Sequence, residues 1–275
     1  MAWSRVKNLL IAMLVAVNVF LLVVYGLISW RENRNLEQVN RDLLSVADSL
    51  GVDLPEHLIR TEVQTLYPMQ VYADREADRL IAESLLGVCE ETVREDGSFL
   101  YRSQAGNLCF FADNIIELEL AISERMTDEA DARRLVKKIL GQLGQTYESV
   151  VAEETSSGQD FLFTVPLAVS GMSVFDSVLT FEITPGLISV SGQRVLHRPK
   201  QLRLDEVQEL PGVLLCLFRY WEEKEILLQT ITDIELGYLA ENRKGERLNL
   251  LPVWHIAVES GDWYVSALDG SIVTP

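Results

Sequence analysis

Residues 9–28 form an unbroken apolar run in which Asn18 is the only amide or charged side chain. A helix rises about 1.5 Å per residue, so a run of this length reaches roughly 30 Å, the thickness of a bilayer's hydrocarbon core. A helix also satisfies its own backbone hydrogen bonds, which lipid cannot do. The run therefore predicts one transmembrane helix over residues 9–30, behind a cytoplasmic head of residues 1–8.

The alternative to a permanent anchor is a cleaved signal peptide, which also begins with positive charge such as that of Arg5 and Lys7. The apolar core of a signal peptide is usually about 7–15 residues long and ends at a small-residue cleavage site. This run is longer and has no Ala-x-Ala pattern after it, and Trp3 and Trp30 bracket it as rings at two membrane interfaces would. We favour an uncleaved anchor.

The charges beside the run do not set its orientation, because Arg31, Arg34 and Arg41 follow it while Arg5 and Lys7 precede it. Long domains translocate largely regardless of charge, however, whereas a head of eight residues is hard to export. We expect a single-pass protein of the cell membrane, with the amino terminus in the cytoplasm and the large domain outside.

The chain is acidic, with 24 basic and 41 acidic residues and a formal net charge of −17. A nucleic-acid binder needs a basic face to neutralise phosphates, so this class of function is excluded. The acidity also opposes flat docking on an anionic membrane and favours basic or cationic partners. A generally acidic soluble surface explains the same composition without any dedicated site.

Three cysteines, Cys89, Cys109 and Cys216, have no metal-binding spacing and cannot all pair with one another. A Cys89–Cys109 bridge is one alternative, and three buried free thiols are the alternative that we favour. So few cysteines in an exported chain do not make a disulfide framework.

The rest of the chain alternates helical patterns with groups of strands. Leu36, Val39, Leu43, Val46 and Leu50 recur at helical spacing before Gly51, which predicts an amphipathic helix that packs on its own domain or, alternatively, forms a stalk coiled coil. The next expected elements are an extended stretch over 56–72, a helix over 74–86, and strands over 88–94, 98–102, 108–112 and 115–122. In this first group Asp96-Gly97 marks a hairpin, and residues 115–122 alternate apolar and acidic side chains.

The same order of elements then begins again. A helix with Thr127 as its N-cap and a buried stripe from Ala132 to Leu143 precedes strands over 146–153, 160–170, 174–184 and 187–196. A further helix over 205–223, interrupted near Pro211-Gly212, precedes strands over 226–240, 248–258 and 263–268. We therefore predict an α+β fold of two domains, residues 31–124 and 125–275, each an antiparallel meander sheet packed with helices.

The sequence contains no catalytic motif. The nucleophile elbow, the phosphate loop, the His-Glu-x-x-His motif and the dinucleotide fingerprint are all missing. His57, His197 and His255 share no metal spacing, and His255 is expected on the less buried side of its strand. Adjacent acidic pairs arise freely in so acidic a chain. We therefore expect neither an enzyme nor a bound metal or cofactor.

The predicted membrane helix offers one specific contact site. Asn18 lies at its middle, where an amide gains about 0.6–2 kcal/mol from a hydrogen bond to another helix. Ala12 and Ala16 form a small-x-x-x-small pair that permits close approach of a second helix. We favour lateral helix pairing over the alternative, in which Asn18 bonds its own backbone.

The two ends of the chain together resemble the YycH/YycI family. Residues 1–7, Met-Ala-Trp-Ser-Arg-Val-Lys, lead directly into a span with a central Asn, as in the YycI-like proteins. The carboxyl end is similar to the tail that both kinds of protein share, in the order Gly-Tyr, Pro-Val-Trp and Tyr-x-x-Ala-x-x-Gly. The residues that carry this second likeness are Gly237, Tyr238, Pro252, Trp254, Tyr264, Ala267 and Gly270.

The resemblance implies a YycI-like regulatory protein of a cell-wall-linked two-component system. Such a protein is a non-enzymatic accessory that pairs with a YycH-like membrane protein and modulates a sensor histidine kinase through membrane helices and outer domains. His255 departs from the family, which more often has Arg or Lys there, and the tail residues are expected to stabilise the fold. The alternatives are an exported module that binds a peptide, glycan or cation without a kinase partner, and a wall hydrolase with two facing carboxylates, or a Ser with a nearby base, in a cleft.

Overall fold

The computed structural model describes residues 13–14, 17–18, 20, 38–59, 66–123, 126, 128–153, 160–195, 199–202, 207–226, 229–241 and 247–274. Most of the expected membrane helix, including Ala12 and Ala16, lies outside these ranges. Within them, no helix combines the length and the apolar character that crossing a bilayer requires.

The fold is α+β and is built on one large mixed, mostly antiparallel sheet of 15 strands. Its main path runs β11-β1-β13-β12-β9-β10-β5-β4-β3-β2, and the other strands pair beside it. The strands are β1 (Met69–Tyr72), β2 (Glu90–Val93), β3 (Phe99–Arg102), β4 (Gly106–Phe110), β5 (Ile115–Ala121), β6 (Thr146–Tyr147), β7 (Val151–Glu153), β8 (Phe161–Val169), β9 (Met172–Thr184), β10 (Leu187–Gln193), β11 (Lys200–Gln201), β12 (Ile231–Glu241), β13 (Arg247–Val258), β14 (Gly261–Ser266) and β15 (Ile272–Val273). The helices are α2 (Arg75–Leu86), α3 (Glu129–Gln142), α4 (Leu210–Glu223), the 3-10 turn η1 (Glu56–Leu58) and an unlabelled helix over 38–49.

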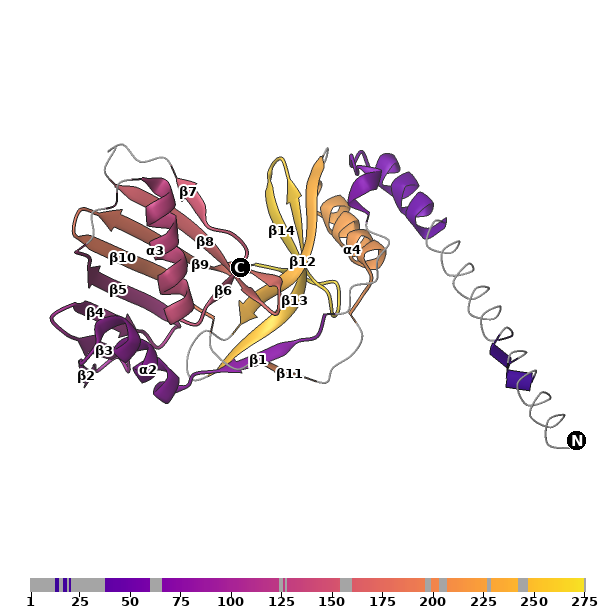
Figure 1. Cartoon of the computed structure of the whole chain (residues 1–275). Helices are drawn as coiled ribbons and strands as arrows, with labels where there is room; N and C mark the ends of the chain where they lie inside the picture. Colours follow the sequence, from indigo (N-terminus) through magenta and orange to yellow (C-terminus); the bar gives the residue numbers. More distant parts are fainter. Residues whose placement is uncertain are drawn as a thin grey trace, which may run out of the picture.

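The sheet carries two lobes (Figure 1). The first lobe comprises β2–β10 with α2 and α3, and the second comprises β1 and β11–β15 with α4 and the helix over 38–49. Strand β9 joins them, because its later residues pair with β10 while Val174 near its start pairs with Tyr238 of β12. This is the only parallel pairing between named strands in the described part of the chain.

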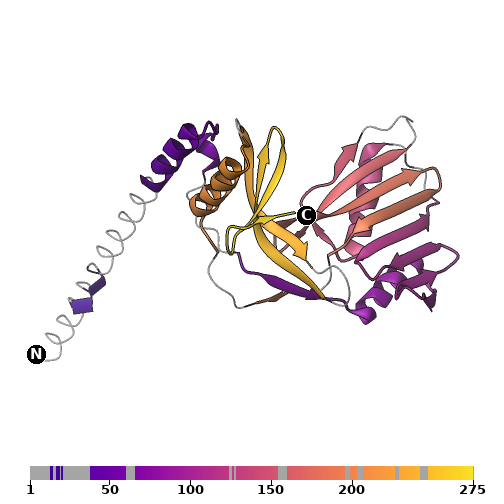
Figure 2. The same cartoon turned by 180° about the vertical axis from the view of Figure 1, so that it is seen from behind.

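The helices of the first lobe cover one face of its strands. Figure 1 shows α3 in front of the strands, and Figure 2, seen from behind, shows the strands in front. Asp74 caps α2 by accepting hydrogen bonds from the backbone N–H groups of Glu76 and Ala77. Asp128 caps α3 in the same way, through Asp131 N–H. The expected cap, Thr127, is one residue earlier and lies outside the described residues.

The second lobe holds the segment nearest the amino terminus. Leu43 and Ala47 of the helix over 38–49 are 2% and 1% exposed and belong to the core, which confirms that this helix packs on its own domain. Val39 and Val46, expected in the buried stripe, are instead 44% and 37% exposed. Gly51 ends this stretch with a φ of 73°, a conformation that glycine adopts readily.

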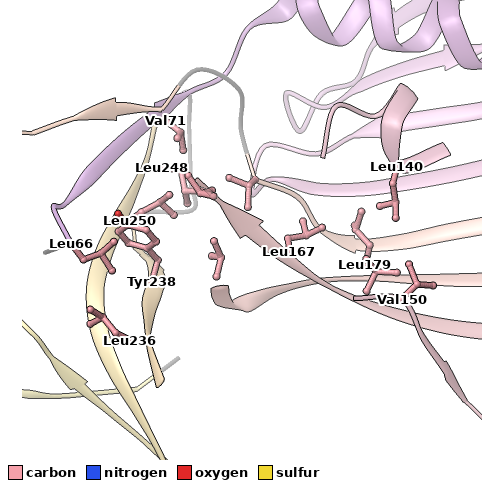
Figure 3. Close-up of a cluster of buried hydrophobic side chains, with 14 of the residues drawn as sticks. Leu66, Val71, Leu140, Val150, Leu167, Leu179, Leu236, Tyr238, Leu248 and Leu250 are labelled. Carbon is pink, nitrogen blue, oxygen red and sulfur yellow. The ribbon is translucent and has the colours of Figure 1, made fainter. Parts of the chain in front are cut away.

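The strand pairing crosses the expected domain boundary at residues 124–125. All seven residues of β5 pair with β10, so the first meander does not form a sheet of its own. The buried side chains of both lobes also form one continuous cluster, which includes Tyr238 and Leu250 of the second lobe and Leu167 and Leu179 of the first (Figure 3). The two expected sheets are therefore one, since a strand pairs with whichever edge shares its register and not only with its neighbour in sequence.

Three local predictions were wrong. Pro211-Gly212 does not interrupt a helix: α4 begins at Leu210, and Pro211 occupies its first turn, where a missing N–H costs nothing. The expected strand over 146–153 is two short strands, β6 and β7. The stretch over 56–72, expected to be extended, includes the turn η1.

Candidate functional site

The face of the first lobe opposite α2 and α3 is the candidate binding surface. Along β5, Ile116 and Leu118 point to the buried side, whereas Glu117 and Glu119 are exposed on the other. Two rows of side chains cross the open face at right angles to the strands. One row is Glu90, Arg102, Asn107, Glu119, Ser189, Glu182 and Leu162, and the other is Thr92, Leu100, Cys109, Glu117, Ser191, Thr180 and Thr164.

A hollow of about 390 Å³ lies on this face, and we name it the β4 hollow. Asn107 and Cys109, the short open-face side chains of β4, lie between longer side chains on β3 and β5. The lining residues are Arg94, Leu100, Arg102, Asn107, Cys109, Glu117, Leu118, Glu119, Ser189, Val190 and Ser191. The hollow therefore arises because β4 carries small groups where its neighbours carry large ones.

Charges of opposite sign line the two sides of the β4 hollow. Arg94 and Arg102 lie on the β2–β3 side, and Glu117 and Glu119 lie on β5. None of these four side chains forms a hydrogen bond or ion pair within the described ranges. Strands are about 4.8 Å apart, so the backbones of β3 and β5 are separated by about 10 Å, with β4 between them. The arrangement presents a cationic and an anionic wall with a neutral floor.

Two further groups lie at or near the β4 hollow. Asp96 accepts hydrogen bonds from the backbone N–H and hydroxyl of Ser98, and these bonds, with the nearby charge of Arg94, lower the pKa of its carboxyl, which therefore stays ionised. Cys109 is 4% exposed, and burial raises the pKa of its thiol. The thiol is therefore a neutral part of the floor at physiological pH.

All three cysteines are free, so the Cys89–Cys109 bridge does not form. Of the three, only Cys109 is fully buried.

A buried ion pair holds α2 against the strands that carry the β4 hollow. The guanidinium of Arg194, just after β10, contacts both carboxylate oxygens of Asp78 on α2, one of them at 2.8 Å from Nη2 to Oδ2. Arg194 also lies over the Phe110 ring, 4.0 Å from its centroid. The two charged residues are 3% and 4% exposed. No sequence pattern indicated this pair, because 116 residues separate its members.

Gly237 and Tyr238, two of the family-like residues of the tail, lie where the two lobes join. Gly237 faces β9 so closely that a Cβ atom there would lie 2.7 Å from both the Phe175 ring and the Ser173 carbonyl oxygen. Next to it, Tyr238 pairs with Pro252 of β13 and with Val174 of β9, and its hydroxyl donates to the Tyr67 carbonyl at 3.0 Å. Burial raises the pKa of Tyr238 to about 12.

The remaining tail residues fix the start of α4 to the sheet. Trp254 Nε1 donates to the carbonyl of Gln208, and the N–H of Gln208 donates to the carbonyl of Ala267. The Ala267 N–H donates in turn to the carbonyl of Pro252 at 2.9 Å. Gly270 leaves room for Cys216 on α4, since a Cβ atom would lie 2.7 Å from its sulfur. These contacts are structural and bring no reactive groups together.

Sequence reasoning missed one cluster at the lobe junction. Phe175 of β9 lies against His255 of β13 and Tyr264 of β14, with ring centroids 5.0 and 5.7 Å away. His255 is partly exposed, as expected, and its Nε2 lies 3.0 Å from a carboxylate oxygen of Asp262. Burial, aided by the charges of Asp262 and Asp176, raises the pKa of Tyr264. The His255 and Tyr264 rings stack on each other, and the Phe175 ring packs against both at a tilt, which ties β9 to the second lobe.

Asn18 is the one residue of the predicted helix–helix contact that the structure describes. Its side-chain Nδ2 donates to the carbonyl of Leu14 at 3.0 Å, one helical turn earlier. This is the local bond that the sequence left open as the alternative to lateral pairing. It uses one of the two amide N–H groups and leaves the side-chain oxygen available as an acceptor.

Within the described ranges no group of three or more His, Cys, Asp or Glu side chains has a geometry that could hold a metal ion. The two carboxylates of the β4 hollow, Glu117 and Glu119, follow each other on one strand and lie on the same wall. A glycoside hydrolase of the usual kind has two carboxylates on opposite sides of the bond that it cleaves.

Comparison with known proteins gives structural neighbours but no family assignment. No family model matches the chain, and no curated protein matches it. An uncharacterized protein from Eubacterium rectale is similar in structure, with a TM-score of 0.48 and 11% identity over 77% of this chain and 86% of that one. The C-terminal domain of YpeB from Bacillus megaterium is similar with a TM-score of 0.35 and 10% identity over 74% of this chain and 97% of that one.

Proposed function

We propose that this protein is a membrane-anchored, non-enzymatic accessory regulator of a sensor histidine kinase in a cell-wall-linked two-component system. In this proposal residues 1–8 lie in the cytoplasm, residues 9–30 cross the membrane, and the two lobes lie outside. The protein acts with a YycH-like membrane partner through contacts of its membrane helix and its outer lobes. The family-like residues at the two ends of the chain support the identity of the partners.

The side chains of the apolar run support the membrane location. Met13, Leu14, Val17 and Phe20 are 66%, 65%, 47% and 65% exposed. Large apolar side chains exposed side by side on a helix need lipid or a partner helix. Asn18 lies among them with an acceptor oxygen and one N–H left to offer. A partner helix that bonds these groups gains about 0.6–2 kcal/mol.

A continuous path from the membrane-proximal helix to the first lobe carries the mechanism. Buried Leu43 and Ala47 hold the helix over 38–49 against the second lobe. The segment after this helix is hydrogen-bonded to the start of β12. The Asp53 N–H donates to the Gln229 carbonyl, and the Ile231 N–H donates to the Asp53 carbonyl, both at 2.9 Å. Strand β12 then pairs with β9 at Tyr238.

Strand β12 contacts both the membrane-proximal segment and the first lobe. A displacement of either of these parts is therefore transmitted through β12 to the other. A partner bound outside can thereby bias the position of the membrane helix. It shifts the kinase between signalling states only by its differential affinity for those states.

Site-specific photo-crosslinking in native membranes tests the proposal. A photoreactive residue at Val17 should capture a sensor histidine kinase, and Asn18→Leu should weaken that capture severalfold because the amide bond to the partner is lost. Met13→Leu is the matched control and should leave capture unchanged, since it replaces one apolar side chain by another. The proposal fails if no histidine kinase is captured, or if capture is as strong in Asn18→Leu as in the original chain.

A second candidate function, an exported binding module without a kinase partner, is favoured by the β4 hollow. It would need no specific contact in the membrane. The crosslinking experiment separates the two, because a binding module predicts lipid adducts alone at position 17.

A further inference from the structure

We propose that the β4 hollow binds a short zwitterionic peptide, with the peptide carboxylate at Arg94 and Arg102 and its ammonium at Glu117 and Glu119. This goes beyond the regulatory function and does not rest on it. The first support is the separation of charge: two cationic side chains lie on one side of the hollow and two anionic ones on the other. A ligand that carries both charges matches both walls.

The second support is that none of these four side chains forms a hydrogen bond or ion pair within the described ranges, although the charge of Arg94 is felt by the nearby Asp96 carboxylate. Other arginines of the chain are paired with nearby carboxylates, as Arg75 is with Glu91 and Arg79 with Glu83. Arg94 and Arg102 form no such pair, although Glu117 and Glu119 line the same hollow. Strand β4 lies between the two sets, so a molecule bound over β4 can contact both.

The third support is size. The walls stand on strands about 10 Å apart. An extended dipeptide spans about 7 Å, so its two charged ends come within contact distance of flexible Arg and Glu side chains. The hollow of about 390 Å³ lies within the range of small-molecule sites. Asn107, Ser189 and Ser191 on its lining offer hydrogen bonds to the peptide group between the ends.

Other ligand classes fit the lining less well. A simple anion such as phosphate is repelled by Glu117 and Glu119, and a simple cation is repelled by Arg94 and Arg102. No aromatic side chain of the described residues lines the hollow, so a sugar ring finds no flat face there to stack on. Of these small molecules, only the zwitterion can place a group of opposite charge against each wall without bringing like charges together.

Calorimetric titration of the full chain in lipid nanodiscs with alanyl-alanine tests the proposal. The dipeptide should bind, and both N-acetyl-alanyl-alanine and alanyl-alanine amide should bind about tenfold more weakly, because each loses one charge-assisted contact. Absence of binding by alanyl-alanine at millimolar concentration would overturn the proposal. Equal binding of all three molecules would overturn it too.

Two variants test which wall of the hollow binds the ammonium end of the peptide and which binds its carboxylate end. Glu119→Gln should remove the preference for a free amine, and Arg102→Gln should remove the preference for a free carboxylate. The matched controls are Glu182→Gln, on the same row two strands beyond Glu119, and Arg247→Gln on β13, neither of which lines the hollow. All four side chains are exposed, so the variants are expected to fold. If the controls lower affinity as much as the test variants, the effect is general electrostatics and the assigned site is wrong.

Discussion

The two lobes are built from one sheet but use its faces differently. In the first lobe one face packs on α2 and α3, and the other is an open surface of charged and hydroxyl side chains that includes Glu117 and Glu119. In the second lobe Pro252, Val253 and Trp254 are buried one after another. Consecutive strand residues point to opposite faces, so here both faces are covered. The first lobe is therefore suited to binding a ligand on its open face, and the second to fixing neighbouring helices and strands in place.

The parts that the second lobe holds are the membrane-proximal helix, α4 and the start of β9. Each is fixed by short-range packing at a small residue or by backbone hydrogen bonds, such as Gly237 against Phe175. The first lobe is stabilised differently, by a core that includes the buried ion pair of Asp78 and Arg194. The difference predicts that the lobes respond to different kinds of substitution.

The largest expected effect is in the first lobe. Arg194→Met should lower the free energy of unfolding by about 3–5 kcal/mol, because it leaves the Asp78 carboxylate buried without its partner. Chemical denaturation followed by circular dichroism measures this. Arg134→Met is the control: its pair with Asp131 is formed by an arginine side chain that is 77% exposed, so the change should stay within about 0.5 kcal/mol. Equal losses in both variants would contradict the role given to burial.

The next effect is at the lobe junction. Gly237→Ala should cost about 1–3 kcal/mol, because the new methyl group overlaps the Phe175 ring and the Ser173 carbonyl. Hydrogen exchange should show the loss first in β9 and β12, where the lobes pair. Gly141→Ala in α3 has nothing within 4 Å of the new carbon and should instead stabilise by about 0.5–1 kcal/mol. A junction that tolerates the methyl group without loss would not be the tight contact described above.

The smallest effect compares one buried tyrosine from each lobe. Tyr238→Phe removes the bond to the Tyr67 carbonyl and should cost about 1 kcal/mol at neutral pH, whereas Tyr101→Phe should cost nothing, because the Tyr101 hydroxyl has no partner in the described ranges. Unfolding titrations of the two variants give both values. A loss in Tyr101→Phe equal to that in Tyr238→Phe would contradict the contrast.

The same tyrosines should differ from ordinary ones in alkali. Burial raises the pKa of Tyr101, with help from the charges of Glu91 and Asp78, and that of Tyr238 to about 12 in each case. The unfolded chain loses these protons near pH 10, whereas the folded chain keeps them until about pH 12, so stability should stay constant below pH 10 and fall as the pH rises toward 12. Each tyrosine accounts for at most about 2–3 kcal/mol of this fall, and replacing it by Phe should abolish its share.

Local patterns predicted most elements of the fold. The helix over 74–86, the hairpin at Asp96-Gly97 and the strands over 248–258 and 174–184 are confirmed within two residues at most of their ends. The patterns could not predict that β5 pairs with β10, because partner choice depends on contacts distant in sequence. The expectation of two separate sheets failed for that reason.

The candidate site was predicted only in part. The alternation of acidic and apolar residues over 115–122 already indicated an exposed acidic face, which carries Glu117 and Glu119. Their position opposite Arg94 and Arg102 depends on the register of three strands, which one sequence does not reveal. Likewise, the resemblance identified Gly237 but not Phe175, the residue that makes Gly237 necessary.

Kinase activity in reconstituted membranes tests the central claim, that a regulator's membrane helix and outer lobes are linked through β12. Autophosphorylation of the captured histidine kinase should change when the full chain is added to its proteoliposomes. The change should be lost or strongly reduced with Asn18→Leu, which weakens the membrane contact, and with Gly237→Ala, which loosens the lobe junction, but kept with Gly141→Ala. Autophosphorylation that is the same with and without the original chain would contradict the account.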